Sequence, residues 1–177
     1  KVFIRHRRPK QALALFDEML AVPGIERLAP EVLFHRAQAL ALDGKAEAGA
    51  DIYRRLATEF PKSSSAPMSL YNLAEYDRSR GKFEQALAEY ARIAERYPAH
   101  SLAPQALRQR AKIFEDSDDP REHGEYDAIL LSYPQSPAAS LAAMNWGVDL
   151  YRRKDYESAR KVFERLLKTN KSAETNS

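Results

Sequence analysis

An aromatic residue followed by proline recurs along this chain at nearly constant spacing. Phe60-Pro61, Tyr97-Pro98 and Tyr133-Pro134 mark it, with intervals of 37 and 36 residues (97 − 60 and 133 − 97), and a serine follows each pair. A fixed period between about 20 and 50 residues is typical of arrays in which one helical unit stacks on the next. Such arrays bury a continuous core between neighbouring units and expose a long binding face. The repeat therefore favours an interaction scaffold over an enzyme.

The composition fits a helix-rich chain with little net charge. Of 177 residues, 44% are apolar, 30% are charged and six are glycine. No apolar run is long enough to span a membrane, and the absence of cysteine excludes disulfides and thiolate chemistry. The formal net charge is +3, and much of it lies in residues 5–10 without interleaved aromatics. We therefore interpret that segment as a solvated helix end, with contact to nucleic acid or anionic lipid as the minor alternative.

The central repeat has the pattern of two helices. Pro67 suits a first helical turn, and Leu70 and Leu73 begin an apolar stripe at helical spacing. Gly81 is placed to end this first helix. The second helix follows at once, and Pro98 closes it because proline cannot continue a helix without a large penalty.

Small and aromatic residues recur in register from repeat to repeat. Small residues let two helices approach closely, and an aromatic side chain fills the groove beside them, so both kinds of position predict core. The small positions are Ala37, Ala74, Ala111 and Gly147 in the first helices and Ala12, Gly49, Ala86 and Ala159 in the second helices; the aromatic positions are Phe16, Tyr53, Tyr90, Tyr126 and Phe163.

This alternation resembles the tetratricopeptide repeat. The resemblance covers nearly the whole chain and implies an all-α fold, a right-handed superhelical solenoid of antiparallel helix pairs that spans residues 1–177 as a single domain. We expect an orphan second helix at 9–22, helix pairs at 30–60, 67–97, 103–133 and 137–168, and a polar tail at 169–177. The long Tyr-Pro linkers are similar to those of bacterial cell-envelope members of the family. They favour the periplasm or the outer-membrane periphery, with the cytoplasm as the alternative. Because the chain opens on Lys1, we expect targeting segments to lie outside it.

One repeat departs from the pattern. Glu122 stands where its second helix should carry a small residue, and Ser117-Asp118-Asp119-Pro120 replaces the glycine turn. Pro120 suits a first helical turn after an aspartate cap. We expect a looser or shorter second helix there. Lys154-Asp155 replaces the turn glycine of the last repeat.

In the resembling family, the first helices line a concave surface and an asparagine holds the backbone of an extended peptide. The resemblance implies a protein or peptide partner and no cofactor, and it puts partner-binding residues in four rows. The amide row reads His35, Asn72, Gln109 and Asn145, and its neighbours are Phe34, Tyr71, Arg108 and Met144, then Glu75 and Lys112, then Arg78 and Tyr151. Met68 and Gln105 occupy the positions of the lysines that bind a C-terminal carboxylate in chaperone-binding members, which argues against that specificity. The alternative is that these side chains only face solvent, in a spacer segment of a longer solenoid.

No motif for catalysis appears. The four histidines form no metal-binding spacing, and Glu122-His123 near Glu125 is interpreted as a surface cluster without a metal. Residues 116–119 lack the glycine and the glutamate of a calcium loop, and no phosphate-binding loop or nucleophile turn is present. We expect neither catalytic, cofactor-binding nor metal-binding residues, and we expect the single tryptophan, Trp146, to pack in the core.

The first helix raises a separate question. An apolar stripe on Ala12, Leu15, Phe16 and Met19 needs a cover if it is exposed. An upstream helix, a second copy of the chain or Val2-Phe3-Ile4 would each supply one. Self-association through this half-repeat is therefore a further prediction.

Overall fold

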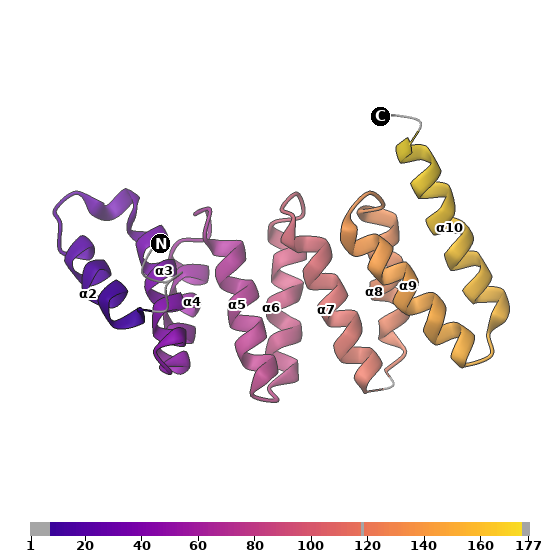
Figure 1. Cartoon of the computed structure of the whole chain (residues 1–177), viewed down its shortest axis with the longest axis horizontal. Coiled ribbons are helices and arrows are strands. Elements are labelled where there is room, and N and C mark those ends of the chain that lie inside the picture. Colours follow the sequence, from indigo (N-terminus) through magenta and orange to yellow (C-terminus); the bar gives the residue numbers. More distant parts are fainter. Residues whose placement is uncertain (1–7, 118, 175–177) are drawn as a thin grey trace. The chain divides into compact units, whose positions relative to one another are not determined.

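The computed structural model of the chain describes residues 8–117 and 119–174, and over these residues it is helical with no strand (Figure 1). The chain divides into two compact units, residues 1–93 and 94–177. The first unit holds α2 (Pro9–Leu20), the 3₁₀ helix η1 (Ile25–Arg27), α3 (Ala29–Leu42), α4 (Ala46–Glu59), α5 (Ala66–Ser79) and most of α6 (Phe83–Arg96). The second holds α7 (Leu102–Asp116), α8 (Arg121–Ser132), α9 (Pro137–Arg152) and α10 (Tyr156–Glu174).

The turns between paired helices follow the local sequence. Gly44 and Gly81 have φ of +81° and +73°, the left-handed conformation that glycine adopts without strain. Lys154 takes the same role in the last repeat with φ of +65°. At the start of α8, Asp119 Oδ1 accepts the backbone N–H of Arg121 at 3.0 Å. Asp119 therefore binds the first backbone N–H of α8, but Pro120 holds the N-cap position and lies one residue before the helix, not in its first turn as predicted.

Two helices can be compared with the lengths predicted from the sequence. The second helix of the irregular repeat, α8, has 12 residues, compared with 14 in α4 and in α6, so it is shorter as expected. The last helix is longer than expected. The pattern ended it at residue 168, but α10 continues to Glu174. No glycine or proline follows Lys168, and nothing in the local sequence stops the helix there.

The predicted core is confirmed. Ala37, Ala74 and Ala111 have no exposed surface, and neither do Tyr90 and Ile93. Gly49 of α4 lies at a close approach to α3. A Cβ built on this glycine would lie 2.8 Å from the backbone oxygen of Ala37 on α3, closer than real Cβ atoms come. The small-residue register thus sets how near paired helices lie.

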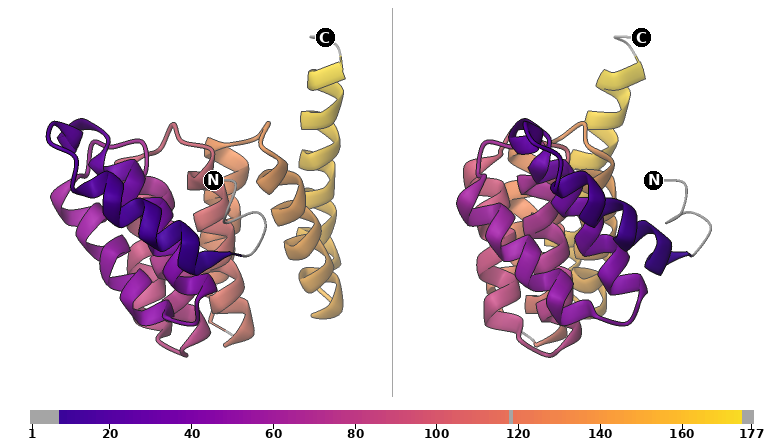
Figure 2. Two further views of the ribbon diagram at one scale, coloured as in Figure 1. Left: turned by 60° about the vertical axis from the view of Figure 1, so that its left-hand side comes forward. Right: turned by 90° about the vertical axis from the view of Figure 1, so that its left-hand side faces the viewer.

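The stripe on α2 is mostly covered by α3. Figures 1 and 2 show the two helices side by side, and Ala12 and Phe16 are buried in a cluster with Val32 and Ala39. Leu15 alone of the stripe is exposed, at 39%. The cover that an exposed stripe would need is therefore supplied mostly by α3. Val2, Phe3 and Ile4, and residues 5–7 of the basic segment 5–10, lie outside the described residues.

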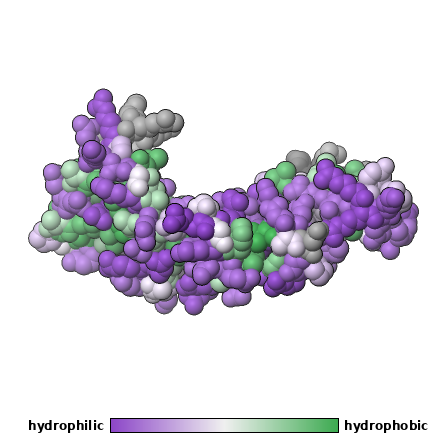
Figure 3. All heavy atoms as spheres, turned by 90° about the horizontal axis from the view of Figure 1, so that it is seen from below, coloured by the Kyte–Doolittle hydropathy of each residue, from purple (hydrophilic) through white to green (hydrophobic). Residues whose placement is uncertain are grey.

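The surface is largely polar. Figure 3 shows polar residues over most of the face that it draws, with apolar residues between them in separate patches. Among the described helices, none combines the length and the apolar character that crossing a membrane requires.

Candidate functional site

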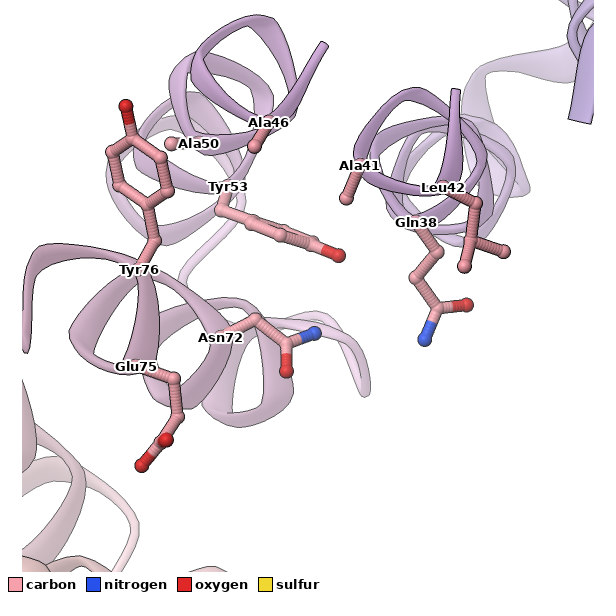
Figure 4. A pocket seen from close by; sticks show the side chains of 9 residues that line it. All are labelled: Gln38, Ala41, Leu42, Ala46, Ala50, Tyr53, Asn72, Glu75 and Tyr76. Carbon is pink, nitrogen blue, oxygen red and sulfur yellow. The ribbon is translucent and has the colours of Figure 1, made fainter. Parts of the chain in front are cut away.

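A cavity of about 460 Å³ opens between α3, α4 and α5 in the first unit (Figure 4). Tyr53 reaches from α4 into the space between the other two helices. The walls are mainly apolar, and Gln38, Asn72 and Glu75 supply the polar groups. The remaining lining residues are Ala41, Leu42, Ala46, Ala50 and Tyr76.

Tyr53 is held in a fixed position by its surroundings. Its ring centroid lies 5.7 Å from that of Phe34, and the two rings are tilted by 50°. Burial raises the pKa of Tyr53 to about 12, and the hydrogen bond from the Asn72 side chain opposes this rise. The phenol is therefore neutral at physiological pH and keeps its proton as a donor.

Glu75 is also fixed, by two partners. It accepts a hydrogen bond from the Tyr90 hydroxyl on α6, and Arg78 Nη2 donates to its Oε2 at 2.9 Å. Tyr71 packs edge-on against the Tyr90 ring, with centroids 5.6 Å apart. This edge of the cavity is thus built from side chains that already hold one another, so little ordering entropy remains to be lost on binding.

Among the partner-binding residues predicted in the first unit, Phe34 lies in the core. It is 5% exposed and packs in the core with Tyr53 and Leu73, so it does not line an open groove. The neighbouring His35 is half-buried, stacks on Phe16 at 6.4 Å and pairs through Nδ1 with Gln38 at 2.9 Å. Asn72 and Glu75 reach the cavity as lining residues, whereas Tyr71 and Arg78 stand beside it.

In the second unit, the predicted residues lie on α7 and α9. Arg108 and Gln109 are half-buried, and Lys112 is exposed. On α9, Met144, Asn145 and Tyr151 are all exposed. The cavity of the first unit does not include them.

Sequence reasoning missed part of the cavity. Tyr53 was assigned to the core alone, and Leu42 and Tyr76 were not singled out. Gln38 follows the small residue Ala37 as Glu75 follows Ala74, so the register of the repeat puts it at the equivalent groove position. Tyr53 both packs and lines a cavity, and periodicity cannot separate these two roles.

An ionic cluster occupies the irregular repeat. Glu122 is 1% exposed, and its Oε1 lies 2.9 Å from Arg153 Nη2 and 3.2 Å from His123 Nε2. Arg153 Nε also lies 2.7 Å from Asp149 Oδ2.

Burial raises the pKa of Glu122, and the Arg153 charge opposes that shift. Single ligand atoms from Glu122, His123 and Asp149 lie within 4.8 Å of one another, close enough for a metal ion. Since Arg153 already supplies the positive charge between the carboxylates, the cluster is an ion-pair network that joins α8 to α9.

Trp146 packs beside this network, as expected. Its ring stacks on Tyr126 at 6.1 Å and lies 5.8 Å from the His123 ring. Both contacts reach back to the preceding helix, α8. The tryptophan therefore belongs to the core of the second unit.

The helix pairs and their small-residue register define a helical-repeat protein. Two sequence models, both described as tetratricopeptide repeat, match the chain, one over residues 1–64 and the other over residues 68–100 and 141–172. The chain is therefore built of tetratricopeptide repeats, which generally mediate protein–protein interaction and belong to scaffolds that are generally not enzymes. Residues 101–140, which include Glu122, lie outside these matches.

Solved structures agree on the fold. The chain is similar to the crystal structure of nearly identical TPR-like repeats of a putative kinesin light chain from Podosopora anserina, with 10% identity and a TM-score of 0.59 over 97% of this chain and 91% of that one. A second crystal structure of those repeats, of a variant, matches with the same identity and TM-score over 98% and 92%. No curated protein sequence matches the chain. The all-α, solenoid-type fold expected from the sequence is confirmed.

Proposed function

We propose that this chain binds a segment of a partner protein along the first helices of its repeats. In the first unit, the cavity over Tyr53 takes an apolar side chain of that segment. The single observation that carries the proposal is the cavity itself, with apolar walls and polar groups at one edge. Binding sites for peptides commonly combine an apolar pocket with a few placed hydrogen-bonding groups.

The polar groups suit a peptide backbone. Gln38 and Asn72 carry side-chain amides, which both donate and accept hydrogen bonds, as the peptide group does. Glu75 adds an acceptor that Tyr90 and Arg78 hold in place. A backbone laid over this edge would meet both donors and acceptors while its side chain enters the cavity.

The test is selection of a displayed random-peptide library on the wild-type chain, followed by titration of single selected peptides. We expect Ala41→Trp, which fills the cavity from an exposed position, to weaken the peptides roughly tenfold or more. Asn72→Ala should weaken the same peptides by a smaller factor. Gln85→Ala, at an exposed position on α6, is the matched control. All three melting temperatures should stay close to that of the wild type. Peptides that bind Ala41→Trp as well as the wild type would place the site elsewhere.

Two finer predictions from the sequence stay predictions. The Tyr-Pro linkers favour a bacterial cell-envelope protein, and cell fractionation of the source organism tests this. Self-association through α2 would have only Leu15 of the original stripe to use, because Ala12 and Phe16 are buried. Light scattering of the chain and of Leu15→Glu compares their masses.

A further inference from the structure

Four large apolar side chains form an exposed stripe along α9. They are Leu141, Met144, Val148 and Tyr151, with 53%, 50%, 38% and 62% of their surface exposed. Their spacing of three, four and three residues puts them on one face of the helix. The buried face of α9 carries different residues, among them Ala142, Ala143 and Leu150. The stripe is therefore no part of the core that holds the repeats together.

The stripe is specific to α9. At the equivalent positions 36 residues earlier, α7 carries Gln105, Arg108, Lys112 and Glu115, all polar. The tetratricopeptide register consequently does not require apolar side chains at this face. Large exposed apolar groups on a contiguous face mark sites of protein contact more often than scattered ones do.

Three cations, Arg108, Lys112 and Arg152, flank the stripe. Arg108 and Lys112 of α7 hold the positions that correspond to Met144 and Val148, and α7 contacts α9 within the second unit. Arg152 follows at the end of α9. In the described part of the second unit, none of these three cations has a carboxylate within ion-pair distance. Other arginines there do: Arg110 with Glu125, Arg121 with Asp119, Arg153 with Glu122 and Arg165 with Asp127.

We propose that the α7–α9 face, made of this stripe and these three cations, binds an acidic segment of a partner protein that carries large apolar side chains. Apolar anchors on the partner would cover the stripe, and its carboxylates would pair with Arg108, Lys112 and Arg152. Charge complementarity of this kind selects the partner and speeds the encounter. The inference rests on the proposed function, because α7 and α9 are first helices, and it names the partner chemistry of their face. This face shares no residue with the cavity over Tyr53, so the two can be tested separately.

A membrane surface is a poorer occupant than a protein segment. Binding to anionic lipid typically needs a cluster of about four to eight lysines or arginines. The α7–α9 face offers three cations, and Glu115 and Asp116 follow two of them, Arg108 and Lys112, along α7. The alternative occupants are nevertheless separate outcomes of the test.

The experiment is a random-peptide selection on wild type, with counter-selection on the double variant Met144→Glu, Val148→Glu. We expect the retained peptides to be rich in Asp and Glu alternating with large apolar residues. They should bind the double variant and Lys112→Glu roughly tenfold or more weakly. Raising NaCl from about 0.05 to 0.3 M should weaken them several-fold.

Two controls keep this result distinct from the proposed function. Leu131→Glu changes an equally exposed apolar residue on α8, at 63% exposure, and should bind the acidic peptides as the wild type does. Ala41→Trp should leave them unaffected while it weakens peptides of the Tyr53 cavity. The proposal is overturned if no peptide depends on Met144 and Val148, or if the dependent peptides lack acidic residues. It is also overturned if the double variant lowers binding to phosphatidylserine vesicles, or lowers self-association, but changes the binding of no peptide.

Discussion

Gly49 of α4 lies so close to Ala37 of α3 that a methyl group on it would stand 2.8 Å from the Ala37 backbone oxygen. The obstacle is main chain, which belongs to a helix and cannot rotate away. The short distance therefore sets the separation of the first complete helix pair.

Replacing this glycine by alanine is expected to destabilise the chain. Gly49→Ala gains roughly 1 kcal/mol of helix propensity, but forcing α3 and α4 apart costs about 1–3 kcal/mol or more. We expect a net loss of about 1–2 kcal/mol in the free energy of unfolding, measured by urea denaturation.

Gly124 supplies the matched control. It lies in α8, with no heavy atom within 4 Å of an added Cβ. Gly124→Ala should therefore stabilise the chain, by about 0.5–1 kcal/mol. Opposite signs for the two substitutions would establish the close approach, and a gain in both would refute it.

The pair formed by Glu89 of α6 and Asp77 of α5 predicts a dependence of stability on pH. The pKa of Glu89 is raised to about 7, first by burial and then by the Asp77 charge, while Arg92 and Arg54 act in the opposite direction. The folded state thus binds this proton more tightly than the unfolded chain, where the ordinary pKa is 4.5. The stabilisation is complete below about pH 4.5 and is lost as pH rises through 7.

Glu89→Gln should remove this dependence. The difference in unfolding free energy between wild type and variant should change by about 2 kcal/mol between pH 4.5 and 8, with the wild type losing stability as pH rises. Glu84→Gln, on the exposed side of α6, should follow the wild-type profile. If the unfolding free energy of Glu89→Gln varies with pH as that of the wild type does, burial and the Asp77 charge do not raise the pKa of Glu89.

The Glu122 network predicts that replacing Arg153 costs more stability than replacing Glu122. Arg153→Met leaves Glu122 buried without its cation, which should cost about 2 kcal/mol at pH 7. Since burial raises the pKa of Glu122, this loss should be smaller at pH 5 than at pH 7, because acid favours the neutral carboxyl group. Glu122→Ala installs the small residue of the other repeats and leaves Arg153 paired with Asp149, so its cost should stay below about 1 kcal/mol. Thermal unfolding at pH 5 and pH 7 measures the cost of each of the two substitutions. Equal costs at pH 7 would contradict the view that Arg153 compensates the buried charge of Glu122.

The sequence predicted the repeat architecture because the core depends on local spacing. Small and aromatic residues recur at helical intervals, and burial follows those intervals directly. Phe34 shows where this reasoning ends. The same register position carries Phe34, Tyr71, Arg108 and Met144, and it ranges from buried in the first to exposed in the last. The Phe34 side chain packs against Tyr53, and spacing alone does not give that direction.

Contacts between residues far apart in the sequence could not be predicted from residue spacing either. The sequence identified Glu122 as a departure and predicted a shorter helix, but its partner Arg153 lies 31 residues further on (153 − 122). The cavity over Tyr53 likewise draws on three helices. Only the packed arrangement shows that Leu42 and Tyr76 reach it.

The close approach at Gly49 also limits how this array can be rebuilt. Repeat proteins are often treated as strings of exchangeable modules that can be shuffled or duplicated at will. Here, grafting α8 into the place of α4 would bring the carboxylate of Glu122 against the Ala37 backbone, where even a methyl group has no room. At this pair the second helix is matched to its own first helix, so another second helix cannot replace it without a change in how the two helices pack.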